Sequence, residues 1–167
     1  MKSFSKPVII SLIIVTIIAS FSAAATARPR PQARVDPRVV GKLAQIVERS
    51  GYAYRKAADN VWVVSFRGKS LPDISVFVTS AENLIVMGAV VAPKRSMRVT
   101  SEMMFKLLRL AHDIDRVKIG FDDDEDLFLR AEVTSRCLDA DEFKSTMEQV
   151  SAGTDKVHAA IKSYLVK

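Results

Sequence analysis

The sequence predicts an α+β domain in which an antiparallel sheet of five to six strands packs with three helices, in the order α-β(3-4)-α-β-β-α. Three observations support this fold class. Apolar residues recur at helical spacing in three separate segments. Short β-branched and aromatic runs, separated by turn residues, fill the stretch after the first helical segment. Two alternating segments then flank the acidic run "DDDED", as the strands of a hairpin would.

The N-terminal residues 1–27 have the pattern of a secretory signal peptide. Lys2 and Lys6 precede an apolar run of 16 residues, and the small residues Ala25 and Ala27 suit a cleavage site. We therefore expect cleavage after about Ala27 and a periplasmic or secreted protein. The alternative is an uncleaved membrane anchor, because the apolar stretch from Val8 through Ala27 is about long enough to cross a bilayer.

The next segment, 28–36, is rich in Pro and Arg and predicts a flexible basic region, which leaves 37–167 as a single domain. The first helix is expected directly afterwards, because Asp36 can cap it and Pro37 suits its first position. Gly51 can close its C-terminus. Its apolar face consists of Val39, Val40, Leu43, Ile46 and Val47.

Short apolar segments after this helix are predicted strands, bounded by turn-forming residues. The segments are 52–56, 61–68, 74–80 and 84–91. In the second of them, Trp62, Val64 and Phe66 alternate with Val61, Val63 and Ser65, so the two sets lie on opposite faces. Both faces are fairly apolar, which indicates that part of the sheet is covered on both sides or dimerised.

A second helix is expected after Thr100 or Ser101, either of which can cap it. Its apolar residues cover much of the helix circumference and include Met103 and Met104. Such a Met-rich stripe suits either core packing or an adaptable groove for a partner.

The acidic run is expected at the tip of a hairpin between 117–121 and 127–133, where adjacent carboxylates point into solvent. An EF-hand loop needs Gly at its sixth position and Glu at its twelfth, but a loop beginning at Asp122 places Leu127 and Val133 there. The run therefore predicts neither a calcium site nor the carboxylate pair of a hydrolase.

The last helix is long and begins at a capping-box-like pair, Asp139 and Glu142. A narrow apolar seam follows at alternating intervals of four and three residues: Phe143, Met147, Val150, Thr154, Val157, Ile161 and Tyr164. Such a seam packs lengthwise on another helix or on a sheet. Gly153 lies beside it and predicts a kink or a frayed second half.

Residue types that carry chemistry are few. Cys137 is the only cysteine, so no intrachain disulfide forms, and a buried apolar role is the first expectation, with an intermolecular disulfide or reactive thiol as the alternative. His112 and His158 are the only histidines, and they do not stand at zinc-site spacing. Because no nucleotide-binding, hydrolase or protease motif occurs, we expect no enzyme activity, no metal and no cofactor.

Three stretches carry a resemblance to a known family: "VVGKLAQIVERSGYAYRKAADNVWVVSFRG", "LIVMGAVV" and "DDDEDLFLRAEV". Together they cover most of 39–165, and the chain resembles the YbjN-like family of bacterial proteins, described as candidate sensory transduction regulators. The fold of that family is similar to that of type III secretion chaperones. The resemblance implies a sandwich-like α+β domain with a protein-binding or regulatory role and no catalytic activity. A cytosolic secretion chaperone would not carry a signal peptide. The signal-peptide pattern therefore argues against that role and favours protein binding in the periplasm.

The expected function is an exported, non-catalytic protein-binding module with a chaperone-like or regulatory role. We expect its partner surface to combine the outer sheet face with the second helix, at Trp62, Val64, Phe66, Met103 and Met104. The expected partners are another protein and a second copy of the chain, and no nucleic acid. The alternative is an envelope-associated structural protein, held at an anionic membrane by an uncleaved anchor or by its basic N-terminal arm.

Overall fold

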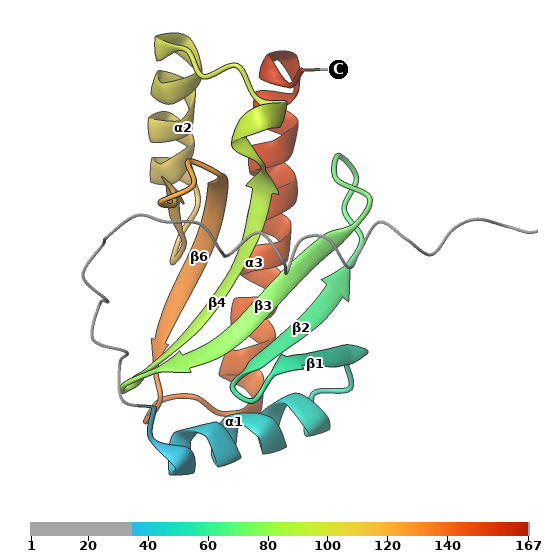
Figure 1. Cartoon of the computed structure of the whole chain (residues 1–167), viewed down its shortest axis with the longest axis vertical. Helices are drawn as coiled ribbons and strands as arrows, with labels where there is room; N and C mark the ends of the chain where they lie inside the picture. Colours follow the sequence, from blue (N-terminus) through green and yellow to red (C-terminus); the bar gives the residue numbers. More distant parts are fainter. Residues whose placement is uncertain (1–34, 167) are drawn as a thin grey trace, which may run out of the picture. The chain divides into compact units, whose positions relative to one another are not determined.

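The computed structural model describes residues 35–166 (Figure 1). The expectations of a signal peptide in 1–27 and of a flexible basic segment up to residue 34 lie outside the described residues. The helices are α1 (Pro37–Arg49), α2 (Ser101–Asp113) and α3 (Ala140–Ile161), with short 3-10 turns at Lys94–Ser96 and Lys162–Tyr164. The strands are β1 (Tyr54–Ala58), β2 (Val61–Phe66), β3 (Ile74–Ala81), β4 (Leu84–Ala92), β5 (Lys118–Phe121) and β6 (Leu127–Thr134). The predicted fold class and element order are confirmed.

The strands form one antiparallel sheet in the order β1-β2-β3-β4-β6-β5. The predicted hairpin around the acidic run is β5–β6, and its second strand pairs with β4, so β6 lies inside the sheet and β5 at its edge. The register places Met87 opposite Ala131 and Ala89 opposite Leu129. The buried residues of β4 and β6 therefore lie on the same face.

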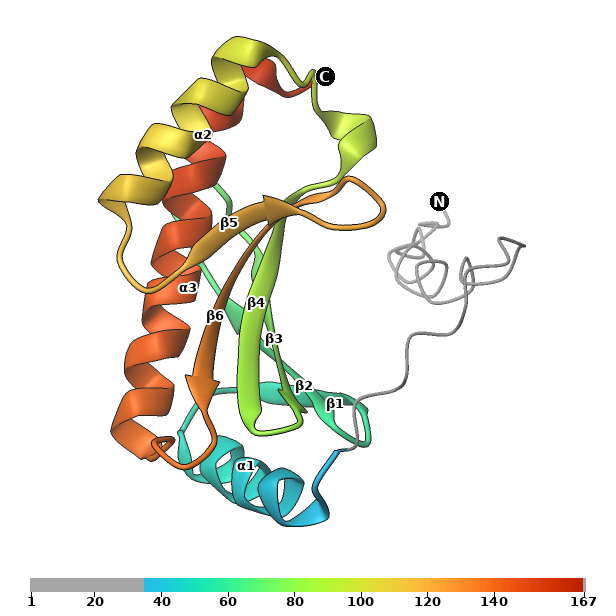
Figure 2. The same cartoon turned by 90° about the vertical axis from the view of Figure 1, so that its left-hand side faces the viewer.

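Helix α3 runs along that buried face (Figure 2). Every residue of its predicted apolar seam is buried except Tyr164, which lies in the 3-10 turn after the helix and is half-buried. The expected kink or fraying at Gly153 is wrong, because α3 is a single helix through this residue. A Cβ atom at position 153 would lie 3.1 Å from Leu129 Cδ1, so glycine lets α3 approach β6 closely.

The other two helices pack around α3 and the end of the sheet. Asp36 caps α1 by accepting the Arg38 N–H at 2.9 Å, and Leu43 and Val47 are buried beneath it. Gly51 follows α1 with a φ of 80°, which is the left-handed conformation that glycine adopts without strain. Helix α2 lies on the same side of the sheet as α3 (Figure 2), so no described helix covers the opposite face.

Candidate partner-binding surface

Three of the five predicted partner-binding residues lie in the core. Trp62 is 3% exposed, and Val64 and Met103 are fully buried, so the expectation that they line an outer surface is wrong. The alternation along β2 was predicted correctly, but the face with Trp62 and Val64 packs beneath the helices. Phe66, on the same face, is half-buried against Tyr52, with ring centroids 5.2 Å apart.

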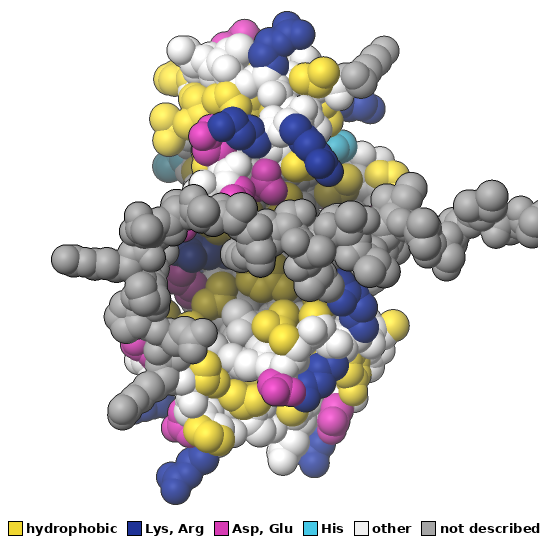
Figure 3. Space-filling model, in the orientation of Figure 1, with side chains coloured by type: hydrophobic (Ala, Val, Ile, Leu, Met, Phe, Trp, Pro, Cys, Tyr) yellow, Lys and Arg dark blue, Asp and Glu magenta, His cyan; other side chains and the backbone are white. Residues whose placement is uncertain are grey.

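Helix α2 presents an exposed apolar surface, which we call the α2 ridge: Met104, Phe105 and Leu108. These side chains are 36%, 64% and 69% exposed, whereas Met103 and Leu107 point into the core. Figure 3 shows hydrophobic side chains gathered at the upper left, where α2 lies. The sequence pattern identified Met104 but not Phe105 and Leu108 as surface residues. The helical spacing contained this information, because positions 103 and 107 lie nearly opposite position 105 on a helix, so burial of the first two exposes the third.

On the opposite flank of α2, Glu102 and Lys106 interact with Tyr164 of the same chain. The Lys106 ammonium lies 5.8 Å from the centre of the Tyr164 ring. Loss of hydration raises the pKa of the Tyr164 hydroxyl, and the hydrogen-bonded Glu102 carboxylate raises this pKa further. This flank is therefore tied to the C-terminal turn, while the α2 ridge faces away from the core.

The sheet face opposite the described helices carries a charged cluster on β5 and β6. Lys118 Nζ lies 2.5 Å from Glu132 Oε2, and Arg130 Nε lies 3.1 Å from Glu132 Oε1. The hydrogen bond from Lys118 lowers the pKa of the Glu132 carboxyl, although partial burial opposes the shift. The Arg130 guanidinium also lies 5.6 Å from the centre of the Phe128 ring. These contacts pair the charges of Lys118, Arg130 and Glu132 within the sheet.

The acidic run forms an ordered turn. Asp122 Oδ1 accepts the N–H groups of Asp124 and Asp126, at 3.1 and 2.9 Å. Asp126 Oδ1 accepts the Lys94 N–H at 2.7 Å, and Lys94 Nζ lies 2.6 Å from Glu125 Oε1. The acids therefore join the hairpin tip to the 3-10 turn at Lys94. Within residues 35–166, no group of three or more side chains is arranged to hold a metal ion.

A serine, a histidine and an aspartate meet where the β2–β3 loop contacts α3. Ser70 Oγ lies 2.8 Å from His158 Nδ1. Asp155, one turn earlier on α3, accepts the backbone N–H groups of Lys69, Ser70 and Leu71 at 2.8 to 3.0 Å. In a catalytic triad the carboxylate orients the histidine, and free N–H groups stabilise the oxyanion. Here Asp155 occupies the loop N–H groups, so this arrangement fastens the loop to the helix. We call it the Asp155 clamp.

Cys137 is exposed, so the expected buried position is wrong. The chain turns after β6, where the Cys137 N–H donates to the Thr134 carbonyl at 2.9 Å, and Leu138 takes the buried position instead. Cys137 lies in an open cleft of about 430 Å³ whose cations are Lys42, Arg49 and Arg136. Asp139, which also lines this cleft, caps α3 through the Glu142 N–H.

Residues 35–166 contain the helices α1, α2 and α3. None of the helices there has both the length and the apolar character needed to cross a bilayer.

Comparison with known proteins shows similarity at the level of structure. No protein-family model and no curated protein sequence matches the chain. A chain of the ExsC–ExsE complex is 15% identical, with a TM-score of 0.53 over 74% of this chain and 93% of that chain. A chain of the heterodimeric ExoU–SpcU complex from the type III secretion system of Pseudomonas aeruginosa is 14% identical, with a TM-score of 0.52 over 71% and 97%.

YbjN from E. coli, a candidate transcription regulator, is 13% identical, with a TM-score of 0.54 over 76% of this chain and 94% of that chain. The chain therefore has a fold shared by YbjN and type III secretion chaperones. The resemblance inferred from the sequence is confirmed as a resemblance of fold.

Proposed function

We propose that this protein is an exported, non-catalytic protein-binding module with a chaperone-like or regulatory role. The α2 ridge is the observation that carries this proposal, because contiguous exposed apolar side chains mark interaction sites. Two of the structures with this fold are complexes with a second protein, which supports the same kind of role. The closed Asp155 clamp supports the absence of hydrolytic chemistry, since its N–H groups are already hydrogen-bonded.

The partner that we propose for the α2 ridge is a second copy of the chain. A two-fold axis beside α2 would bring Phe105 and Leu108 against the same residues of the other copy, so one apolar surface would cover itself. This places the dimer contact on α2 rather than on the strand face that carries Trp62.

The dimer proposal predicts that Leu108→Glu dissociates the protein without unfolding it. Leu108 is 69% exposed, so the folded monomer tolerates a carboxylate there, whereas two carboxylates in a desolvated contact oppose association. We expect the dissociation constant to rise at least about tenfold. Light scattering on residues 28–167 at micromolar concentration measures the mass, and thermal melting measures the fold.

Ala57→Glu is the matched control, because it adds the same charge at an exposed position of β1, away from α2. It should leave the dimer mass unchanged. A monomer mass that persists for the unmodified protein as its concentration rises excludes the dimer. Dissociation by Ala57→Glu but not by Leu108→Glu would instead place the contact at the β1 edge.

Cell fractionation tests export. The signal-peptide pattern predicts a processed species that begins near residue 28 and is released with the periplasm. A full-length species in the membrane fraction that resists high salt would favour the uncleaved anchor. A processed species that high salt releases from the membrane would instead indicate that the basic N-terminal arm binds anionic lipid.

A further inference from the structure

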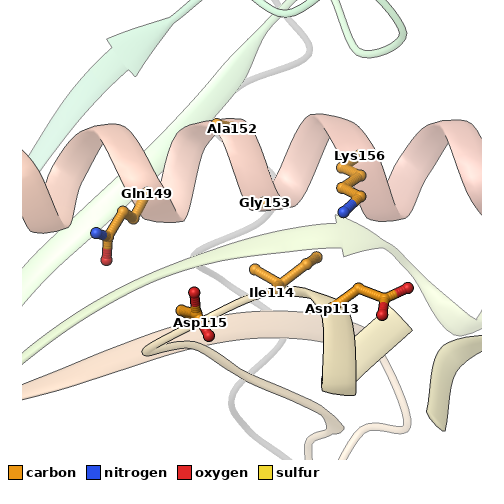
Figure 4. A pocket seen from close by; sticks show the side chains of 7 residues that line it. All are labelled: Asp113, Ile114, Asp115, Gln149, Ala152, Gly153 and Lys156. Atoms are coloured by element: carbon orange, nitrogen blue, oxygen red, sulfur yellow. The ribbon is translucent and has the colours of Figure 1, made fainter. Parts of the chain in front are cut away.

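A second cleft, of about 280 Å³, lies between the end of α2 and the middle of α3 (Figure 4). Gln149, Gly153 and Lys156 line it from one side of α3, and Asp113, Ile114 and Asp115 line it from the segment that ends α2. A Cβ atom at position 153 would lie 3.6 Å from Ile114 Cγ2, an ordinary van der Waals distance, so Gly153 and Ile114 lie close together at the cleft. The floor is therefore apolar, and the polar groups stand around it.

The hydrogen-bond acceptors of this cleft lack donors. Gln149 Oε1 is buried without a hydrogen-bond partner, which is unfavourable for a carbonyl oxygen that water would otherwise solvate. Asp115 is exposed and forms no hydrogen bond or ion pair with any residue in 35–166. The neighbouring cation, Arg116, pairs with Glu142 instead.

The two ends of the cleft differ in charge. Figure 4 shows Gln149 and Asp115 at one end, and Lys156 and Asp113 at the other. Seven residues of α-helix separate Gln149 from Lys156, a rise of about 10 Å. The Lys156 ammonium therefore lies at the Asp113 end, and the other end carries the Asp115 carboxylate and the unpaired Gln149 Oε1.

We propose that the Gln149–Asp115 end of this cleft binds the guanidinium group of an arginine side chain from a bound polypeptide. A guanidinium carries five N–H donors in a planar fork. It can donate to Asp115 and, once rotation of the half-buried Gln149 side chain exposes its Oε1, to Gln149 as well. Its aliphatic stem packs on the Ile114 and Gly153 floor. The cleft is shallow and smaller than most sites for free small molecules, which favours a protruding side chain.

This inference rests on the proposed protein-binding function and names one chemical feature of the partner. The probe is the capped tripeptide acetyl-Gly-Arg-Gly-amide, titrated into the labelled full chain while the Gln149 side-chain amide is followed by NMR. We expect a saturable shift with a millimolar dissociation constant. The citrulline analogue has the same shape without the charge, so it should give no saturable shift.

Two substitutions at the cleft separate recognition from general charge attraction. Asp115→Asn should weaken binding about tenfold. Gln149→Leu should weaken binding similarly, with the shift of the Asp115 backbone amide as the readout. The melting temperature should be unchanged or higher, because the substitution removes an unpaired acceptor. Asp59→Asn makes the same charge change in the β1–β2 turn and should have no effect.

Equal shifts with the arginine and citrulline peptides, or equal weakening by Asp59→Asn, would overturn the proposal. No saturable shift up to about 10 mM peptide would also overturn it. These results concern the cleft alone, since the dimer and export tests do not use its residues. Peptide binding by a chain that stays monomeric would keep the arginine site and remove the α2 dimer.

Discussion

Trp62→Glu should unfold the domain. Trp62 is 3% exposed in the core beneath the helices, opposite Val78 of β3. Removing a buried aromatic side chain costs about 3–5 kcal/mol, and burying a carboxylate in its place costs more. Small domains have only about 5–15 kcal/mol of stability. We therefore expect the melting temperature to fall by about 12 °C or more, measured by circular dichroism.

Ser65→Glu is the control for this substitution. Ser65 belongs to the same strand but lies on the face opposite the described helices, where it is exposed. The free energy of unfolding should therefore change by less than about 0.5 kcal/mol. A folded Trp62→Glu monomer with a nearly unchanged melting temperature would contradict the structure. It would mean that Trp62 is an outer, partner-facing residue, as the sequence alone suggested.

The helix boundaries were predictable because their signals are local. Asp36, Thr100 and Asp139 were each expected to cap a helix, and each accepts a backbone N–H two or three residues further on. Such contacts depend on side-chain chemistry over less than one helical turn. The strand faces were predictable for the same reason, since side chains alternate along any strand.

Which apolar side chains are exposed was less predictable, because a local sequence pattern does not show which other elements cover an apolar face. Both faces of β2 are fairly apolar, and only the docking of the helices decides that Trp62 is buried and Val63 is not. Likewise, the exposure of Phe105 follows from which side of α2 packs inward. The sequence indicated the fold, whereas the exposed residues of the candidate surface could be identified only from the packing of the helices.

The clefts and the Asp155 clamp also join distant parts of the chain. Asp155 meets Leu71 across 84 residues of sequence, and no motif marks either residue. Gln149 and Asp115 lie 34 positions apart and line the same cleft, where Gln149 Oε1 is buried without a donor. Such sites can be found only after the chain is folded.

Asp155→Ala should destabilise the domain through the loss of the clamp. Its carboxylate accepts three backbone N–H groups from 69–71, and hydrogen bonds to a charged group are worth about 1.5–3 kcal/mol each in buried settings. Lys69 is exposed and Ser70 and Leu71 are half-buried, so water replaces part of this energy. We therefore expect a total loss of about 2–3 kcal/mol in urea unfolding.

Gly68→Ala should break the same clamp from the loop side. A Cβ atom at position 68 would lie only 2.1 Å from Asp155 Oδ1 and 2.8 Å from the Leu71 carbonyl oxygen, so the loop must move. Because both substitutions remove the same interaction, their combined cost should be clearly less than the sum of the single costs. Asp73→Ala, at an exposed acid two residues beyond Leu71, should have almost no effect. Equal costs for Asp73→Ala and Asp155→Ala would mean that the clamp contributes no net stability.

The clamp also predicts how stability depends on pH. The N–H groups of Leu71, Ser70 and Lys69 hold the pKa of the Asp155 carboxyl below its ordinary value of 3.8, and nearby His158 acts in the same direction. A carboxyl whose pKa is lower in the folded state stabilises that state fully above its unfolded pKa. This stabilisation disappears as the pH falls through the lowered folded pKa, because the protonated carboxyl is a weaker acceptor. The stability difference between the unmodified protein and Asp155→Ala should therefore be constant near neutral pH and shrink below about pH 4. A difference that stays constant down to pH 2 would show that the side chain contributes through packing and not through its charge.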